Sequence, residues 1–94
     1  METGTHPHLL IIEDDVLLND MTKRLLHQHG YCVTSAYSGS EALLLIEKSG
    51  YDLILLDLML PGIPGEAVLE KIKSTMDIPI IGVSAKTDID SKVN

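Results

Sequence analysis

Basic residues are scarce in this chain of 94 residues, which holds seven Lys and Arg against fourteen Asp and Glu. The formal net charge is −7, and the few cations are scattered between positions 23 and 92. Surfaces that bind nucleic acids or anionic membranes need clustered positive charge. We therefore expect this chain to contact neither DNA or RNA nor an anionic membrane surface.

Cysteine is almost absent, and long hydrophobic runs are missing. The single Cys32 excludes an internal disulfide and fits a reducing compartment. Its neighbours are typical of a strand, so we expect a buried and inert thiol. No run reaches the roughly 18 apolar residues of a membrane-spanning helix, and no signal peptide or lipidation motif is present. A cytoplasmic location is the expectation.

Glycine is missing from residues 13–20, which follow the first apolar run. A dinucleotide-binding domain needs a glycine-rich turn at this place, where the first strand leads into the first helix. That class of function is therefore excluded. The turn is acidic instead, and it begins Glu13-Asp14-Asp15.

Short apolar runs alternate with amphipathic stretches along the chain. Residues 1–7 show no periodicity and are expected to form a flexible N-terminal tail, with the folded domain at 8–94. The order βαβαβαβ predicts an α/β fold with a doubly wound parallel sheet. The pattern places strands at 8–13, 31–37, 52–57 and 78–83 and helices at about 15–29 and 65–74, with a further helix that Ser38-Gly-Ser40 opens and that runs through Lys48. In the first helix, Leu17, Met21 and Leu25 mark an apolar stripe with Leu18 and Leu26 beside it.

Two of the predicted strands end in carboxylates. The first apolar run is followed by Glu13, Asp14 and Asp15, and the run Leu53–Leu56 is followed by Asp57. Continuous apolar runs predict strands that are buried on both faces, and the carboxyl ends of parallel strands are where α/β proteins bind ligands. Like charges this close are costly unless a cation lies among them. The sequence therefore predicts a divalent metal site beside a nucleophilic carboxylate.

Helix capping is the alternative interpretation of the acidic turn, because carboxylates favour helix N-termini. We prefer that role for Asp15. We prefer a metal site for Asp14, because Asp57 comes to the same edge of the sheet. Glu13 is left open between direct contact with the metal and contact through water. Asp52 lies at the opposite end of its strand and is interpreted as a solvated residue.

Together these features resemble the receiver domain of two-component response regulators, from about His8 to the end of the chain. The resemblance rests on the β/α order and on three segments: Leu9-Leu-Ile-Ile-Glu-Asp-Asp15, Asp57-Leu-Met-Leu-Pro-Gly62 and Pro79-Ile-Ile-Gly-Val-Ser-Ala85. It implies a flavodoxin-like sheet of order 2-1-3-4. The family's fifth strand, with its lysine and switch residue, has no counterpart here. We therefore expect a C-terminally truncated receiver domain.

Matched by position, the resemblance also implies a phosphoacceptor site that uses Mg²⁺. Asp57 matches the phosphoacceptor, and Glu13 and Asp14 match the acidic pair that binds the metal with it. The backbone carbonyl of Met59 matches a further metal ligand, and Ser84 matches the hydroxyl that bonds the phosphoryl group and acts in switching. The implied partner is a sensor histidine kinase, and the implied output of the parent protein is transcriptional. Such a domain assists its own phosphorylation and is not a turnover enzyme.

Two other functions stay open. A receiver-like interaction module would work without phosphorylation, although Asp14, Asp57 and Ser84 together argue against it. A metal-dependent α/β phosphatase typically carries a second Asp two residues after its nucleophile, where this chain has Met59. We also predict self-association. Without a fifth strand, the apolar segment Ile78–Val83 lies at the edge of the sheet, where it can pair with or be exchanged between copies.

Overall fold

The computed structural model describes residues 6–60 and 65–83, and within them four strands alternate with three helices. Their bounds are β1 (His8–Ile12), α1 (Val16–Gln28), β2 (Cys32–Ala36), α2 (Gly39–Lys48), β3 (Leu53–Asp57), α3 (Gly65–Thr75) and β4 (Ile80–Val83). Every helix and strand expected from the sequence is present, with ends that shift by no more than about two residues, a common margin. None of the helices in these two ranges is long and apolar enough to cross a membrane.

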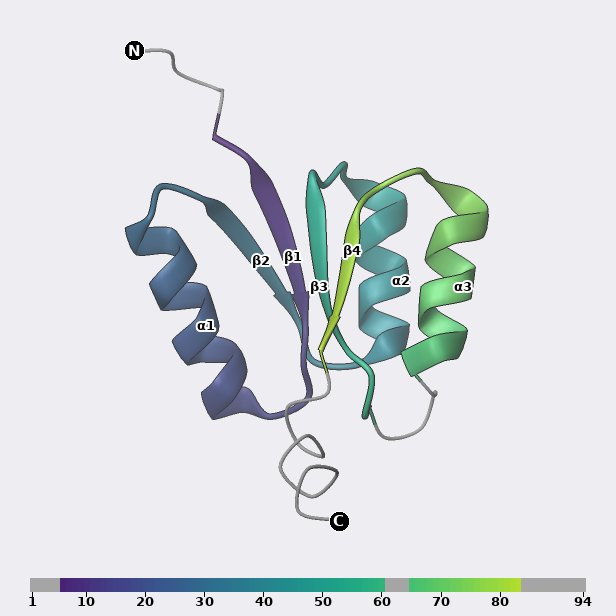
Figure 1. Ribbon diagram of the computed structural model, residues 1–94, viewed down its shortest axis with the longest axis horizontal. Helices are drawn as coiled ribbons and strands as arrows, with labels where there is room; N and C mark the ends of the chain where they lie inside the picture. Colours follow the sequence, from purple (N-terminus) through teal and green to yellow (C-terminus); the bar gives the residue numbers. More distant parts are fainter. Residues whose placement is uncertain (1–5, 61–64, 84–94) are drawn as a thin grey trace.

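The strands form one parallel sheet in the order β2-β1-β3-β4. This arrangement confirms the doubly wound, flavodoxin-like α/β fold that the sequence predicted. Helix α1 lies on one face of the sheet, and α2 and α3 lie on the other (Figure 1). Because β1 is paired on both sides, its last residue, Ile12, lies level with Ala36 of β2 and Leu56 of β3.

Side chains cap the first two helices at their N-termini. Asp15 accepts a hydrogen bond from the backbone N–H of Leu18 at 3.1 Å, and Ser38 does the same for Glu41 at 3.1 Å. Each bond satisfies one of the backbone donors that a helix leaves open at its start. The structure therefore confirms the preferred interpretation of Asp15 as a helix cap.

Gly30 ends the turn after α1 with a φ angle of +93°, the one positive φ angle among residues 6–60 and 65–83. A Cβ atom added there would meet no other atom within 4 Å, so only the backbone conformation disfavours a side chain. We expect Gly30→Ala to lower the free energy of unfolding by about 1–2 kcal/mol. The matched control is Gly50→Ala, at a site that is equally open but has no positive φ angle. Urea denaturation compares the two, and an equal loss of stability in both would contradict the account.

The main core lies between the sheet and the helices α2 and α3. Alternate residues of the two central strands point into it, and both helices send residues to meet them. The fully buried members are Leu10, Ile12, Ile54, Leu56, Ala36, Ala42, Val68 and Ile72. Burying each large aliphatic side chain of this set contributes about 1.5–3 kcal/mol. This core fixes the strand ends that carry the acidic residues.

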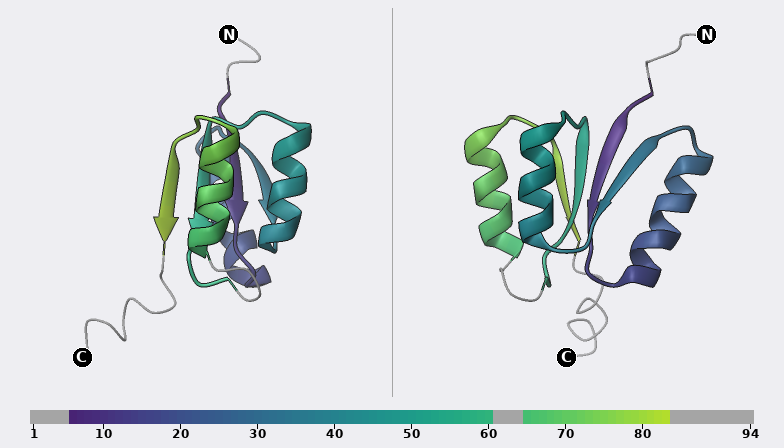
Figure 2. Two further views of the ribbon diagram at one scale, coloured as in Figure 1. Left: turned by 90° about the vertical axis from the view of Figure 1, so that its right-hand side faces the viewer. Right: turned by 180° about the vertical axis from the view of Figure 1, so that it is seen from behind.

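The face that carries α1 is less well covered, and here the predicted burial was partly wrong. Leu9 and Ile11 of β1 are buried, as expected. Leu55 of β3, in the run predicted to be buried on both faces, is only half-buried. On β4, which was expected to be an edge strand with apolar side chains on both faces, Ile81 and Val83 are 51% and 42% exposed. The physical reason is that α1 lies beside β2, away from β4, and no other described helix covers this face (Figure 2).

The stripe of α1 that faces the sheet also differs from the predicted one. The residues of the predicted stripe are between 55% and 69% exposed: Leu17, Met21 and Leu25. The sheet instead receives Leu18, Thr22 and Leu26, which are half-buried, and Asn19, which is fully buried. Successive helical residues differ by about 100° in direction, so this neighbouring stripe corresponds to a rotation of about one residue.

Cys32 is exposed, which contradicts the expectation of a buried thiol. It is the first residue of β2, and β2 is an outer strand of the sheet. Its backbone N–H donates to the carbonyl of Pro7 at 2.9 Å, so the backbone is paired although the side chain is not covered. Neighbours that are typical of a strand therefore do not ensure that a side chain at the end of the strand is buried.

Candidate functional site

Three carboxylates meet where β1 and β3 end. Ile12 pairs with Leu56, so the residues that follow them, Glu13 and Asp57, leave neighbouring strands at the same level. One oxygen from each of Glu13, Asp14 and Asp57 lies within 4.8 Å of the others. We call these three residues the acidic cluster. Their convergence at the carboxyl edge of the sheet confirms the arrangement predicted from the sequence.

The acidic cluster is shielded from water. Asp57 is 4% exposed, Glu13 is 8% exposed, and Asp14 is half-buried. Carboxylates this close repel one another, and burial strengthens the repulsion because the surroundings screen it poorly. A divalent cation that prefers hard oxygen ligands relieves it. Carboxylate oxygens within 4.8 Å of one another fit Mg²⁺, since one or two of them can bind directly while the metal keeps several waters.

Asp57 is held by the end of β3. It is the last residue of that strand, paired with Val83 of β4, and the next backbone N–H, of Leu58, donates to the Val83 carbonyl at 2.8 Å. The carboxylate oxygen Oδ1 accepts a hydrogen bond from the backbone N–H of Met59 at 2.9 Å. Strand pairing and this bond fix both the backbone and the side chain of Asp57.

Hydrogen bonds also order the acidic turn after β1. The Glu13 N–H donates to the Ala36 carbonyl at 3.0 Å, and its Oε2 accepts from the Asp15 N–H at 2.8 Å. Asp15 itself caps α1 and lies outside the acidic cluster. Asp52, at the other end of β3, is exposed and accepts a bond from the His8 N–H at 2.8 Å. Its interpretation as a strand-start residue is confirmed.

Comparison with known proteins decides the family. The response regulator receiver domain family matches residues 9–94. The chain belongs to this family. The transcriptional regulatory protein AfsQ1 of Streptomyces coelicolor is 42% identical over 82 residues, which cover 87% of this chain and 36% of that protein. The uncharacterized transcriptional regulatory protein YbdJ of Bacillus subtilis is 41% identical over 86 residues, covering 90% of this chain and 38% of that protein. The chain thus spans well under half the length of these relatives.

Solved receiver domains share the fold. The Francisella response regulator 1452 receiver domain has a TM-score of 0.81 and 31% identity, with 94% of this chain and 74% of that chain covered. Response regulator TrrA from Thermotoga maritima, solved in complex with Mg(2+)-BeF, has a TM-score of 0.78 and 30% identity, with 89% and 76% covered.

Membership of the family gives the acidic cluster its general meaning. A receiver domain is not a turnover enzyme, and it works with a partner kinase of a two-component system. In this receiver domain Glu13, Asp14 and Asp57 are grouped as in the family's phosphorylation site. The similar full-length proteins named above are transcriptional regulators.

For two of the predicted site residues, Met59 and Ser84, the functional role stays a prediction. Met59 is 46% exposed, and its N–H bonds Asp57, while the predicted role of its carbonyl as a metal ligand stays a prediction. Ser84 lies outside the described residues, which end at Val83 on this side. Its role in binding the phosphoryl group also stays a prediction.

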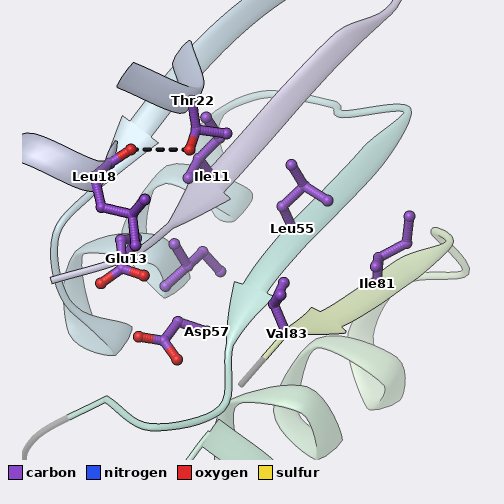
Figure 3. Close-up of a pocket in the computed structure, with 9 residues that line it drawn as sticks. Ile11, Glu13, Leu18, Thr22, Leu55, Asp57, Ile81 and Val83 are labelled. Carbon is purple, nitrogen blue, oxygen red and sulfur yellow. Dashed lines mark hydrogen bonds between the residues drawn. The ribbon is translucent and has the colours of Figure 1, made fainter. Parts of the chain in front are cut away.

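An apolar groove of about 330 Å³ leads away from the acidic cluster of the receiver domain. It runs between α1 and the sheet, with Glu13 and Asp57 at one end (Figure 3). Leu55, Ile81 and Val83 form its wall on β3 and β4. On the α1 side, the Thr22 hydroxyl donates to the Leu18 carbonyl at 2.8 Å. The donor of this hydroxyl is therefore satisfied within the helix, and the groove stays largely apolar.

Asn19 is a residue that sequence reasoning missed. It is 0% exposed, and together with Glu13 and Asp57 it makes up the buried polar and charged side chains of the described ranges. The signal in the sequence is a polar residue beside Leu18 on the stripe of α1 that faces the sheet. Because periodicity favoured the neighbouring stripe of Leu17, Met21 and Leu25, it gave no reason to expect Asn19 in the core.

Proposed function

We propose that this receiver domain accepts a phosphoryl group on Asp57 in a Mg²⁺-dependent reaction with a sensor histidine kinase. The observation that carries the proposal is the grouping of Asp57 with Glu13 and Asp14 within 4.8 Å at the carboxyl edge of the sheet. Membership of the receiver family supports it, as does the structural similarity to TrrA, which was solved with Mg(2+)-BeF.

In this proposal Asp57 acts as the nucleophile. Its carboxylate attacks the phosphorus in line with the bond to the donor, the P–N bond breaks, and the electron pair leaves with the imidazole of the kinase histidine. The product is an aspartyl phosphate. Glu13, Asp14 and Asp57, with the Met59 carbonyl, would hold Mg²⁺, which when bound supplies positive charge to offset the phosphoryl oxygens. Because the end of β3 already fixes Asp57, little order is lost on reaction.

The proposed output is transcriptional. AfsQ1 and YbdJ are transcriptional regulatory proteins, and this chain matches 36% and 38% of their lengths, which leaves room in such proteins for an effector that contacts DNA. In this proposal the Ser84 hydroxyl donates a hydrogen bond to the new phosphoryl oxygens, and this bond changes the surface of the domain near Ser84. The proposal also includes a cytoplasmic location and a receiver domain that begins at about residue 8.

Intact mass spectrometry tests the proposal. The chain is incubated with Mg²⁺ and a small-molecule phosphodonor, and the expected result is the addition of one phosphoryl group that chelation of the metal prevents. The alternative function, an interaction module that is not phosphorylated in this form, predicts no addition. In that case the measurement is repeated on a chain extended through the next strand. Continued failure there would contradict the proposal.

Self-association through β4 is a further prediction. Within the described residues β4 is the last strand of the sheet, and Ile81 is 51% exposed on it. An apolar edge strand can pair with another copy, whereas a lysine on such an edge blocks pairing. We expect Ile81→Lys to shift the chain towards monomer, and Leu44→Lys, at an exposed site on α2, to leave its association unchanged. Light scattering that shows the unmodified chain as a monodisperse monomer at high concentration would count against this prediction.

A further inference from the structure

We propose that Asn19 is a positioning residue, whose buried amide sets the acidic turn in the geometry that the metal requires. This inference rests on the proposed function, because it concerns the same site. Asn19 lies in the first turn and a half of α1 and is not part of the acidic cluster. Its side chain is nevertheless fully buried against the ends of β1 and β2.

The amide group of Asn19 makes three hydrogen bonds. Its Nδ2 donates to the backbone carbonyls of Glu13 at 3.0 Å and Ala36 at 3.1 Å, and its Oδ1 accepts from the Ser35 hydroxyl at 2.5 Å. Backbone carbonyls can only accept, so the amino group must face them and the oxygen must face Ser35. The chemistry of the neighbours therefore fixes the orientation of this side chain.

The side chain and the backbone of Asn19 together hold the residues on both sides of Asp14. The backbone of Glu13 is held twice, because its N–H donates to the Ala36 carbonyl at 3.0 Å and its carbonyl accepts from Asn19. The carbonyl of Asp15 accepts from the backbone N–H of Asn19 at 2.9 Å. Asp14 lies between two peptides that Asn19 touches directly. The side chain of Asn19 holds the peptide that joins Glu13 to Asp14, whereas the bond to the Asp15 carbonyl is made by the backbone of Asn19 and remains when the amide is removed.

Asp57 does not depend on Asn19 in the same way. Its backbone is held by pairing between β3 and β4, and its Oδ1 by the Met59 N–H. Loss of the Asn19 amide would therefore move Glu13 and Asp14 relative to Asp57. A cation that demands a near-ideal octahedron responds strongly to such a change. Groups that orient metal ligands typically change metal affinity by about 10-fold to 100-fold when they are removed.

A purely structural role for Asn19 makes a different prediction. The same side chain links α1 to β2 through Ala36 and Ser35, so its removal also loosens the fold. If that link were its whole role, stability would fall while the metal affinity of the folded protein stayed the same. Ser35→Ala is the matched control, because it removes one bond of the same network and leaves both donations of Nδ2 in place.

Isothermal titration with Mg²⁺ tests the inference on the whole chain, with each variant first shown to be folded by circular dichroism. We expect Asn19→Ala to raise the Kd for Mg²⁺ by at least about tenfold, and Ser35→Ala to change it by less than about twofold. An unchanged Kd in Asn19→Ala, or an equal rise in both variants, would overturn the positioning role. Absence of Mg²⁺ binding in the unmodified chain would overturn the proposed function instead.

Amide hydrogen exchange provides a readout that needs no metal. In the unmodified chain we expect the N–H groups of Glu13 and Asp15 to be protected. We expect both to exchange faster in Asn19→Ala, with Leu56 of β3 unchanged. If Asn19→Ala does not fold, Asn19→Ser, which keeps a polar group in the space, takes its place in both experiments. Rapid exchange at Glu13 and Asp15 in the unmodified chain would overturn the inference whichever variant folds.

Discussion

Asp57→Asn is expected to abolish phosphorylation of the chain by a small-molecule donor, reducing the phosphorylated fraction to background. The amide has the same shape as the carboxylate and keeps an oxygen that can accept the Met59 N–H bond now seen at 2.9 Å. It lacks the anionic oxygen that attacks phosphorus. Intact mass spectrometry in the presence of Mg²⁺ measures the change.

The same substitution should stabilise the metal-free protein. It removes one of three negative charges whose oxygens lie within 4.8 Å, so repulsion in the folded state falls. The matched control is Asp52→Asn, an identical chemical change at the exposed end of β3 that points away from the site. Asp52→Asn should be phosphorylated like the unmodified chain. Phosphorylation of Asp57→Asn at the normal extent would contradict the assignment of the acceptor.

Leu56→Ala is expected to lower the free energy of unfolding by about 2–5 kcal/mol, the range for large aliphatic side chains cut back in a core. Leu56 is 0% exposed in β3 and belongs to the core between the sheet and α2 and α3. Small domains have a total stability of about 5–15 kcal/mol, so such a loss is a large part of it. The acidic cluster forms only when the sheet is folded, so phosphorylation of Asp57 should fall in parallel with the folded fraction.

Leu44→Ala provides the comparison for that experiment. It removes the same atoms from a side chain of α2 that is 60% exposed, and we expect a change within about 0.5 kcal/mol. Urea denaturation followed by circular dichroism gives both values. Equal shifts of the midpoint in the two variants would show that the core is not where the structure places it.

The sheet and the acidic cluster were predictable because both follow from local patterns. Each apolar run is short, and a helical stretch separates it from the next, so parallel pairing follows from the β/α order. Carboxylates at the ends of two such runs must then meet at the carboxyl edge, as Glu13 and Asp57 do. The helix cap at Asp15 is equally local, since its partner, Leu18, is three residues away.

The orientation of α1 was not predictable in this way. Two adjacent stripes of the helix are apolar, one starting at Leu17 and one at Leu18, and periodicity alone does not choose between them. The stripe that faces the sheet includes Asn19, whose hydrogen-bond partners Ser35 and Ala36 lie 16 and 17 residues further along the chain. A local pattern carries no information about such partners.

The prediction that β3 is buried on both faces was partly wrong for a related reason, and β4 shows the same effect. A continuous apolar run shows that a strand can be buried on both faces, but not that a helix lies over each face. Ile80 packs against the core on the side of α2 and α3, whereas its neighbour Ile81 is 51% exposed on the side of α1. What covers a strand is decided by other segments of the fold.

Locating the added phosphoryl group tests directly whether Asp57 is the residue that accepts it. The chain is phosphorylated in the presence of Mg²⁺, the acyl phosphate is reduced with borohydride, and peptide sequencing by mass spectrometry finds the residue that has become homoserine. We expect conversion at Asp57, and not at Asp14, Asp15 or Asp52. Conversion at another aspartate, or a phosphoryl group found on a histidine or serine, would contradict it.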